Sequence, residues 1–111
     1  MSTATRKVEP DFGLSHGVVA KLRGVFAEIP AVEQVIIYGS RVKGDYRPAS
    51  DIDLTVKGAT VAWHDLQVIE QKIDDLLLPY KVDLSLFGHI DNENLIEHIK
   101  RVGKVFYEKT E

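Results

Sequence analysis

The stretch that most constrains this chain joins an apolar run, a Gly-Ser pair and an Asp-x-Asp. The apolar run Val35–Tyr38 ends at Gly39-Ser40, and Asp51-x-Asp53 then opens an alternating pattern. A glycine lets the backbone turn tightly and approach a ligand, and a helix that begins at Ser40 would direct free N–H groups at an anion. The two aspartates supply the oxygen ligands that Mg²⁺ prefers. This order of residues favours phosphate and metal chemistry.

Hydrophobic periodicity predicts an α+β domain, a small mixed sheet of three to four strands packed against helices. Apolar residues at helical spacing predict a first helix over 14–29 capped by Ser15, with Val18 on its inward face. The run 34–38 predicts a central strand covered on both faces. A helical turn at 40–44, strands at 51–56, 81–87 and 105–107, and helices at 60–78 and 91–102 complete the prediction, with Thr60 and Asp91 as caps and Ala62 and Leu77 facing inward.

Two of the predicted strands place aspartates opposite an aliphatic stripe. Asp51 and Asp53 alternate with aliphatic residues in one strand, and Asp83 does so in the next. Residues two apart on a strand point the same way, with Cα atoms about 6.5–7 Å apart, so Asp51 and Asp53 would converge. Asp83 would join them if the two strands pair. Such carboxylates repel one another and hold protons unless cations intervene, and two Mg²⁺ ions about 3.5–4 Å apart would meet that need.

Together these residues resemble the signature of a known protein family. Gly39-Ser40-Arg41-x-x-Gly44, followed by Ser50-Asp51-Ile52-Asp53-Leu54, closely resembles the signature of the minimal nucleotidyltransferase (MNT) domain, in the DNA polymerase β-like nucleotidyltransferase superfamily. The order of elements resembles this family from about residue 14 to residue 107. The resemblance implies the nucleotidyltransferase fold and its reaction. A hydroxyl attacks the α-phosphorus of a nucleoside triphosphate, expected to be ATP, and pyrophosphate leaves.

The resemblance also implies roles for single residues. Asp51 and Asp53 would bind both Mg²⁺ ions, and Asp83 would hold the ion that activates the acceptor and take up the acceptor's proton. The residues expected to bind the triphosphate are Gly39, Ser40, Arg41, Lys43 and Gly44. Which of the cations Arg41, Lys43 and Arg47 points inward stays open in the sequence.

Each half of the pattern has a plainer interpretation when it stands alone. An Asp-x-Asp on a strand is more often a solvated face, and a Gly-Ser after a strand is usually only a turn. Their occurrence together, at the family's spacing, favours the site over both. Asp83 could be a surface carboxylate, but its strand position favours metal binding. The four histidines lack ligand spacing and receive no role.

Chain length bears on the acceptor. With 111 residues there is room for one domain, expected over 12–111 after a mobile lead-in over 1–11. Larger relatives carry extra domains for their second substrate, so a partner protein is expected to complete the site. The chain resembles the MNT antitoxin of HEPN–MNT toxin–antitoxin pairs, which implies transfer of AMP to a tyrosine of a HEPN toxin. The alternatives are a non-catalytic antitoxin of the same fold and a small-molecule, aminoglycoside-type nucleotidyltransferase.

Composition excludes several other classes. The net charge of -3 argues against a non-specific nucleic-acid binder, which usually has a basic surplus. The absence of cysteine excludes disulfides and thiolate metal sites. No apolar run approaches membrane-spanning length and no secretory signal is visible, so a cytoplasmic location and no membrane partner are expected.

Overall fold

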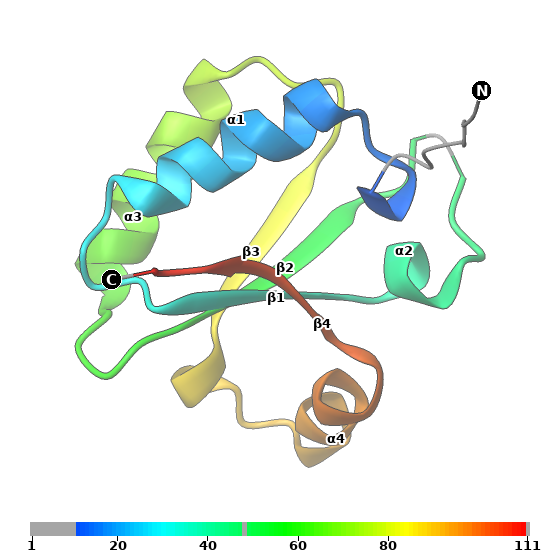
Figure 1. Cartoon of the computed structure of the whole chain (residues 1–111). Coiled ribbons are helices and arrows are strands. Elements are labelled where there is room, and N and C mark those ends of the chain that lie inside the picture. The colour runs from blue at the N-terminus through cyan, green and yellow to red at the C-terminus, as the bar shows by residue number, and fades with distance from the viewer. Residues whose placement is uncertain (1–10, 48, 111) are drawn as a thin grey trace.

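The computed structural model describes residues 11–47 and 49–110, which form a single mixed sheet with helices on both faces (Figure 1). The expected mobile lead-in over 1–11 lies outside the described residues, apart from Asp11, which opens a 3-10 helix. The elements in chain order are η1 (Asp11–Gly13), α1 (His16–Ala27), β1 (Gln34–Tyr38), α2 (Ser40–Lys43), β2 (Ile52–Lys57), α3 (Trp63–Asp75), β3 (Val82–Leu86), η2 (Phe87–His89), α4 (Glu93–Val102) and β4 (Lys104–Glu108). This architecture confirms the predicted α+β class.

The sheet has the strand order β3-β2-β1-β4. Strand β1 pairs antiparallel with both β2 and β4, whereas β2 and β3 are parallel. Parallel neighbours need a long crossover connection, and α3 supplies it. The predicted central strand is therefore confirmed at β1, and the predicted pairing of the two aspartate-bearing strands is confirmed at β2 and β3.

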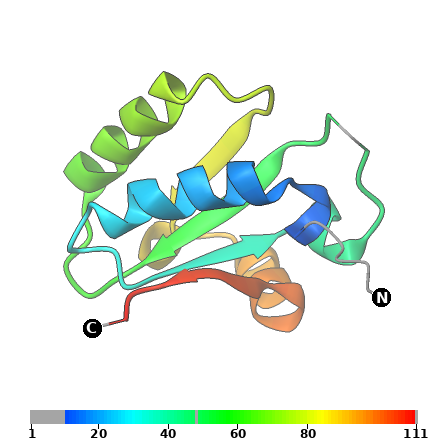
Figure 2. The same cartoon turned by 45° about the horizontal axis from the view of Figure 1, so that its top comes forward.

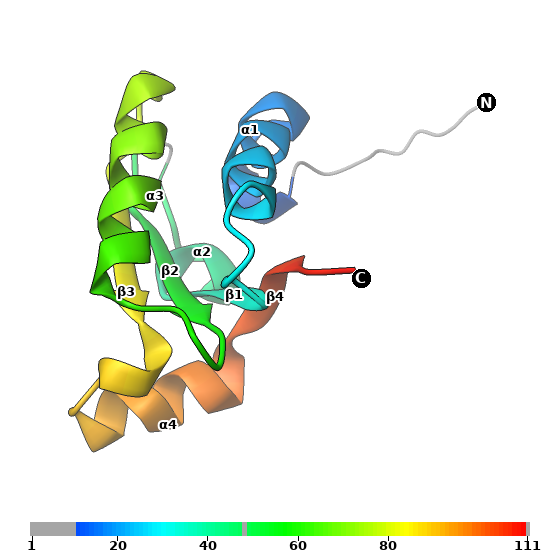
Figure 3. The same cartoon turned by 90° about the vertical axis from the view of Figure 1, so that its left-hand side faces the viewer.

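The two faces of the sheet are covered differently. Helices α1 and α3 lie side by side over one face, and α4 lies on the other, with α2 beyond the end of β1 (Figures 1, 2 and 3). The core fills the space between the sheet and the α1–α3 layer. In β2, Ile52, Leu54 and Val56 are fully buried toward that layer, which fixes the register of the strand. Asp53 must then face the opposite side.

Several local predictions need correction. Ser15 caps α1 as expected, accepting a hydrogen bond from the Val18 N–H; Val18 is partly buried against the core as predicted, and Val19, which was not predicted, is buried within it. Helix α3 begins after Ala62 instead of Thr60, because the Asp65 carboxylate accepts the Ala62 N–H at 2.9 Å. Ala62 itself is exposed.

The ends of α3 and α4 also differ from expectation. Leu77, predicted to face inward, is 87 % exposed with φ at +55°, because α3 ends at Asp75 and the chain turns there. The cap of α4 is Asn92 instead of Asp91, and its side-chain oxygen accepts hydrogen bonds from two backbone N–H groups of the first turn. Within the described residues, none of the helices has both the length and the apolar character needed to cross a membrane.

Candidate functional site

Strand pairing places three polar side chains in one row across the sheet. Tyr38 of β1 is the register partner of Asp53 of β2, which is in turn the partner of Asp83 of β3. Directly paired residues project from the same face with Cβ atoms about 4.5–5.5 Å apart. The row lies on the face opposite the α1–α3 layer, because the aliphatic neighbours of Asp53 in β2 occupy the other one. The expectation that Asp83 would lie beside Asp53 is confirmed.

The two carboxylates interact strongly. Burial, the charge of Asp83, a hydrogen bond with Asp83 and the charge of Asp51 together raise the pKa of Asp53 from 3.8 to about 6. When Asp53 is protonated the pair can share that proton, and both carboxylates ionise together readily only where a positive charge compensates them. Lys81 Nζ lies 3.8 Å from Asp83 Oδ1, but both side chains are well exposed, so this ion pair contributes little.

Gly39 brings the Gly-Ser turn against the same carboxylate. Its φ of +83° and ψ of −154° lie in a region that only glycine adopts readily. A Cβ at this position would also collide with the Asp53 carboxylate. The next residue, Ser40, begins α2, and its hydroxyl hydrogen-bonds to no residue of the described ranges. The two halves of the sequence pattern therefore meet in space.

The remaining predicted triphosphate residues lie farther along α2. Gly44 ends the helix in the left-handed conformation, with φ at +88°, and donates its N–H to the Ser40 carbonyl at 2.9 Å. Lys43 is exposed. Arg41 is buried, with its guanidinium hydrogen-bonded to backbone carbonyls of the protein. Triphosphate binding by Lys43 and Gly44 stays a prediction, and the placement of Arg41 argues against that role for it.

Asp51 lies just before β2 and is exposed, and it influences Asp53 through charge alone. In the ranges that the structure covers, 11–47 and 49–110, no three acidic, histidine or cysteine side chains surround a single point closely enough to hold a metal ion. The donor chemistry nevertheless fits Mg²⁺, since a hard cation would replace the proton shared by Asp53 and Asp83. Metal binding by these three aspartates stays a prediction.

Sequence reasoning missed Tyr38 as part of the site. Burial raises the pKa of the Tyr38 hydroxyl, a hydrogen bond with Ser85 lowers it, and the charges of Asp53 and Asp83 raise it further. The Ser85 hydroxyl in turn donates to Thr55 Oγ1 at 2.9 Å. The only signal in the sequence was the position of Tyr38 directly before Gly39, since the cross-strand register that joins these groups cannot be read from spacing.

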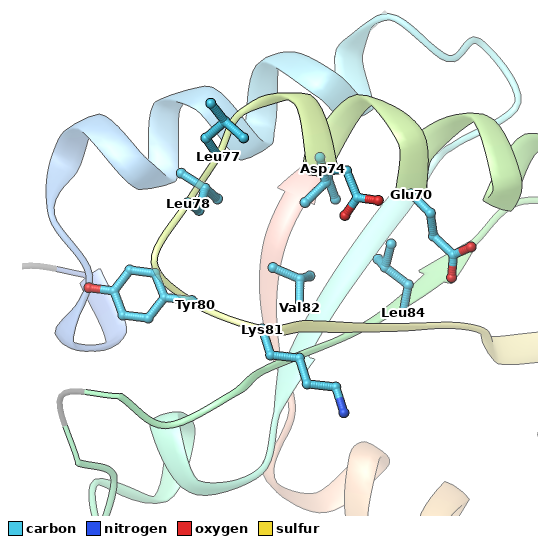
Figure 4. Close-up of a pocket in the computed structure, with 9 residues that line it drawn as sticks. Glu70, Asp74, Leu77, Leu78, Tyr80, Lys81, Val82 and Leu84 are labelled. Carbon is cyan, nitrogen blue, oxygen red and sulfur yellow. The ribbon is translucent and has the colours of Figure 1, made fainter.

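A pocket of about 420 Å³ lies between α3 and β3, away from this row (Figure 4). Leu77, Leu78 and Tyr80 line one end of it, and Val82 and Leu84 of β3 form part of its wall. These strand residues alternate with Asp83 and therefore face the other side of the sheet. The pocket is not part of the carboxylate site.

The shared proton predicts how stability depends on pH. Because the pKa of Asp53 is raised to about 6 in the folded state, the folded protein binds this proton more tightly than the unfolded chain. This contribution is fully present below pH 4 and is lost as the pH rises through 6. We expect metal-free protein to lose about 1 kcal/mol from this group, a value discounted for its partial exposure.

Urea unfolding at pH 4.5 and pH 7.5 measures this loss, with Asp53→Asn as the reference. The other titrating groups are shared by both proteins, so the difference between their pH dependences isolates Asp53. Identical pH dependences would contradict the proton-sharing geometry.

Comparison with known proteins identifies relatives at the level of family and fold. The family model described as "Polymerase beta, Nucleotidyltransferase" matches residues 20–111. No curated protein gives a significant match. A chain of a crystal structure of a toxin–antitoxin with AMP-PNP is 22% identical, with a TM-score of 0.66, over 83% of this chain and 74% of that one.

Two further solved structures are similar. A chain of the toxin–antitoxin MntA–HepT is 21% identical, with a TM-score of 0.61, over 86% of this chain and 74% of that one. A chain of the structure of a tri-AMPylated Shewanella oneidensis HEPN toxin in complex with MNT antitoxin is 21% identical, with a TM-score of 0.60, over 83% of this chain and 71% of that one. At such identities the likeness concerns the fold, and it confirms the predicted nucleotidyltransferase fold.

Proposed function

Because the chain belongs to the polymerase β nucleotidyltransferase family, we propose that it transfers AMP from ATP to a hydroxyl group in a Mg²⁺-dependent reaction. The acceptor that we propose is a tyrosine of a partner HEPN toxin, which the modification would silence, so that this protein acts as the antitoxin. One observation carries the proposal. Asp53 and Asp83 are direct register partners on β2 and β3, and the Asp53 carboxylate lies against Gly39, which brings an acidic pair and a close-approach backbone into one place.

The reaction forms a bond between the acceptor oxygen and the α-phosphorus and breaks the bond to pyrophosphate. Bound Mg²⁺ would neutralise phosphate charge and clamp the attacking and leaving oxygens. Asp51, Asp53 and Asp83 would hold the metal. Asp83, whose side chain is 48% exposed on strand β3 at one end of the strand order, is the carboxylate that an acceptor could reach and that could take up its proton.

The other half of the site suits the triphosphate. Gly39 has no side chain to keep a phosphate away, and the Ser40 hydroxyl can donate to a phosphate oxygen. The contact of Gly39 with Asp53 means that phosphates at the turn would lie next to the metal ligands. A single triphosphate could therefore bridge the two halves.

The proposed partner draws on the structural relatives. One is a toxin–antitoxin with AMP-PNP, and another is a tri-AMPylated HEPN toxin with its MNT antitoxin. We propose that the second protein presents its hydroxyl at the edge of the sheet formed by β3, which carries Asp83.

The test mixes ATP labelled at the α-phosphate with Mg²⁺, the protein and the HEPN protein encoded beside it. We expect label on a tyrosine of the HEPN protein and loss of its ribonuclease activity. Inhibition of the ribonuclease without label would contradict catalysis and indicate a binding antitoxin. In a parallel reaction to which an aminoglycoside is added, label on the aminoglycoside and none on the HEPN protein would overturn the proposed acceptor.

A further inference from the structure

We propose that Arg41 is a positioning residue, which fixes the loop that presents Asp51 to the site. This inference rests on the proposed function in one respect, namely that Asp51 is a metal ligand. Arg41 follows the Gly-Ser turn directly, so its charge suggests a phosphate ligand in the sequence. The contacts of its side chain point to a different role.

The Arg41 side chain is directed into the protein. The residue is 3% exposed, and its guanidinium donates hydrogen bonds to two backbone carbonyls from different segments. Nε and Nη2 reach the Ser50 oxygen at 3.3 and 2.9 Å, and Nη1 reaches the Phe12 oxygen at 3.0 Å. The guanidinium carbon also lies 5.1 and 5.0 Å from the ring centroids of Tyr46 and Tyr80. Binding a phosphate would require it to give up these contacts.

These contacts connect the segments that carry the site. Arg41 itself follows Gly39-Ser40 in α2, and its acceptor Ser50 is the residue directly before Asp51. Tyr80 lies just before β3, which carries Asp83. The same region is tied by the Ile52 N–H, which donates to the Lys81 carbonyl at 2.9 Å. One side chain thus spans the turn, the start of β2 and the start of β3.

Arginine suits this task better than lysine. Its planar guanidinium directs several N–H donors along fixed directions and stacks against aromatic rings. The two carbonyls that Arg41 reaches lie on separate segments, so both can be satisfied at once by a rigid fork. A lysine ammonium at this position would keep the charge and lose that geometry.

The test is Arg41→Lys, measured in two ways that need no turnover. In metal-free protein, amide hydrogen exchange at Ile52 should become at least about tenfold faster relative to exchange at Ile37 in the central strand. In the absence of nucleotide, Mn²⁺ affinity measured by electron paramagnetic resonance should fall on the order of tenfold, as for other residues that orient metal ligands.

Arg23→Lys is the matched control. Arg23 makes the same kinds of contact away from the site, with Nε donating to the Phe106 oxygen at 2.8 Å and its guanidinium 5.3 Å from the Phe106 ring centroid. This variant should leave both the relative exchange of Ile52 and the Mn²⁺ affinity as in the wild type. A general loss of stability would speed exchange at Ile37 as well as at Ile52, so the ratio of the two rates separates it from a local effect.

The outcomes separate this inference from the proposed function. Unchanged Ile52 exchange and Mn²⁺ affinity in Arg41→Lys, with weaker ATP binding, would overturn the positioning role and make Arg41 a phosphate ligand. If the wild type binds no Mn²⁺, the proposed function fails, and Ile52 exchange alone still decides the role of Arg41. If Arg41→Lys does not fold, Tyr46→Leu removes one ring from the guanidinium, and unchanged Ile52 exchange in it would overturn the inference.

Discussion

Replacing Asp53 with asparagine is expected to reduce the rate of AMP transfer by at least about 10³-fold. The Asp53 carboxylate lies against Gly39 on one side and beside Asp83 on the other. Its loss would therefore affect both the metal and the position of the triphosphate. A catalytic metal supplies several kcal/mol of transition-state stabilisation, and about 4 kcal/mol corresponds to 10³ in rate. Asparagine has nearly the same shape but lacks the charge that holds the cation.

The same variant should be more stable than the wild type when no metal is present. Burial and the charge of Asp83 raise the pKa of Asp53, and a neutral amide avoids both the burial of a charge and the repulsion, so the melting temperature at pH 7.5 should rise by a few degrees. Asp74→Asn, an exposed change on α3 and thus on the other face of the sheet, is the control for both measurements. Wild-type transfer rates in Asp53→Asn would exclude this carboxylate from the reaction.

Replacing Gly39 with alanine is expected to cost both stability and metal binding. The backbone at Gly39 lies in a region that other residues adopt at a cost of about 1–3 kcal/mol. The new Cβ would also displace the Asp53 carboxylate. Together these effects should lower the melting temperature by on the order of 5–20 °C and abolish detectable Mn²⁺ binding.

Gly44→Ala is the matched control for this substitution. Gly44 also has a positive φ, of +88°, but a Cβ there meets no atom within 4 Å. Its replacement should cost about 1–2 kcal/mol for the left-handed conformation and leave Mn²⁺ binding intact. Equal losses of metal binding in the two variants would show that backbone strain alone, without the contact to Asp53, explains the effect.

The positions of the strands, and the face on which their side chains lie, could be predicted from the sequence. Residues buried on one face of a sheet recur at every second position, which gives a clear pattern. The apolar run Val35–Tyr38 marked β1, which spans Gln34–Tyr38, and the aliphatic stripe of β2 required Asp53 to face away from the core. The same alternation placed Asp83 on the face that it occupies. Caps were less predictable. Thr60 is a good capping residue, but the helix begins after Ala62, whose N–H is accepted by the side chain of Asp65 in the first turn.

The role of Arg41 could not be predicted because its partners are distant in sequence. Adjacent residues show only a cation after a Gly-Ser pair, whereas its burial depends on Phe12, Tyr46 and Tyr80. Tyr38 was missed for a similar reason. Its contact with Ser85 and the two aspartates arises from the register of three strands, which no single stretch of sequence encodes.

Titration of the Asp53 side-chain carboxyl carbon by nuclear magnetic resonance, with and without Mg²⁺, tests the proposed site most directly. Without metal, Asp53 should titrate with an apparent pKa of about 6, well above its ordinary value, because of its burial and the nearby charge of Asp83. Saturating Mg²⁺ should remove this titration from the neutral range, because the cation takes the place of the shared proton. Titration of Asp53 near its ordinary value, unchanged by Mg²⁺, would contradict a metal site at this row of carboxylates.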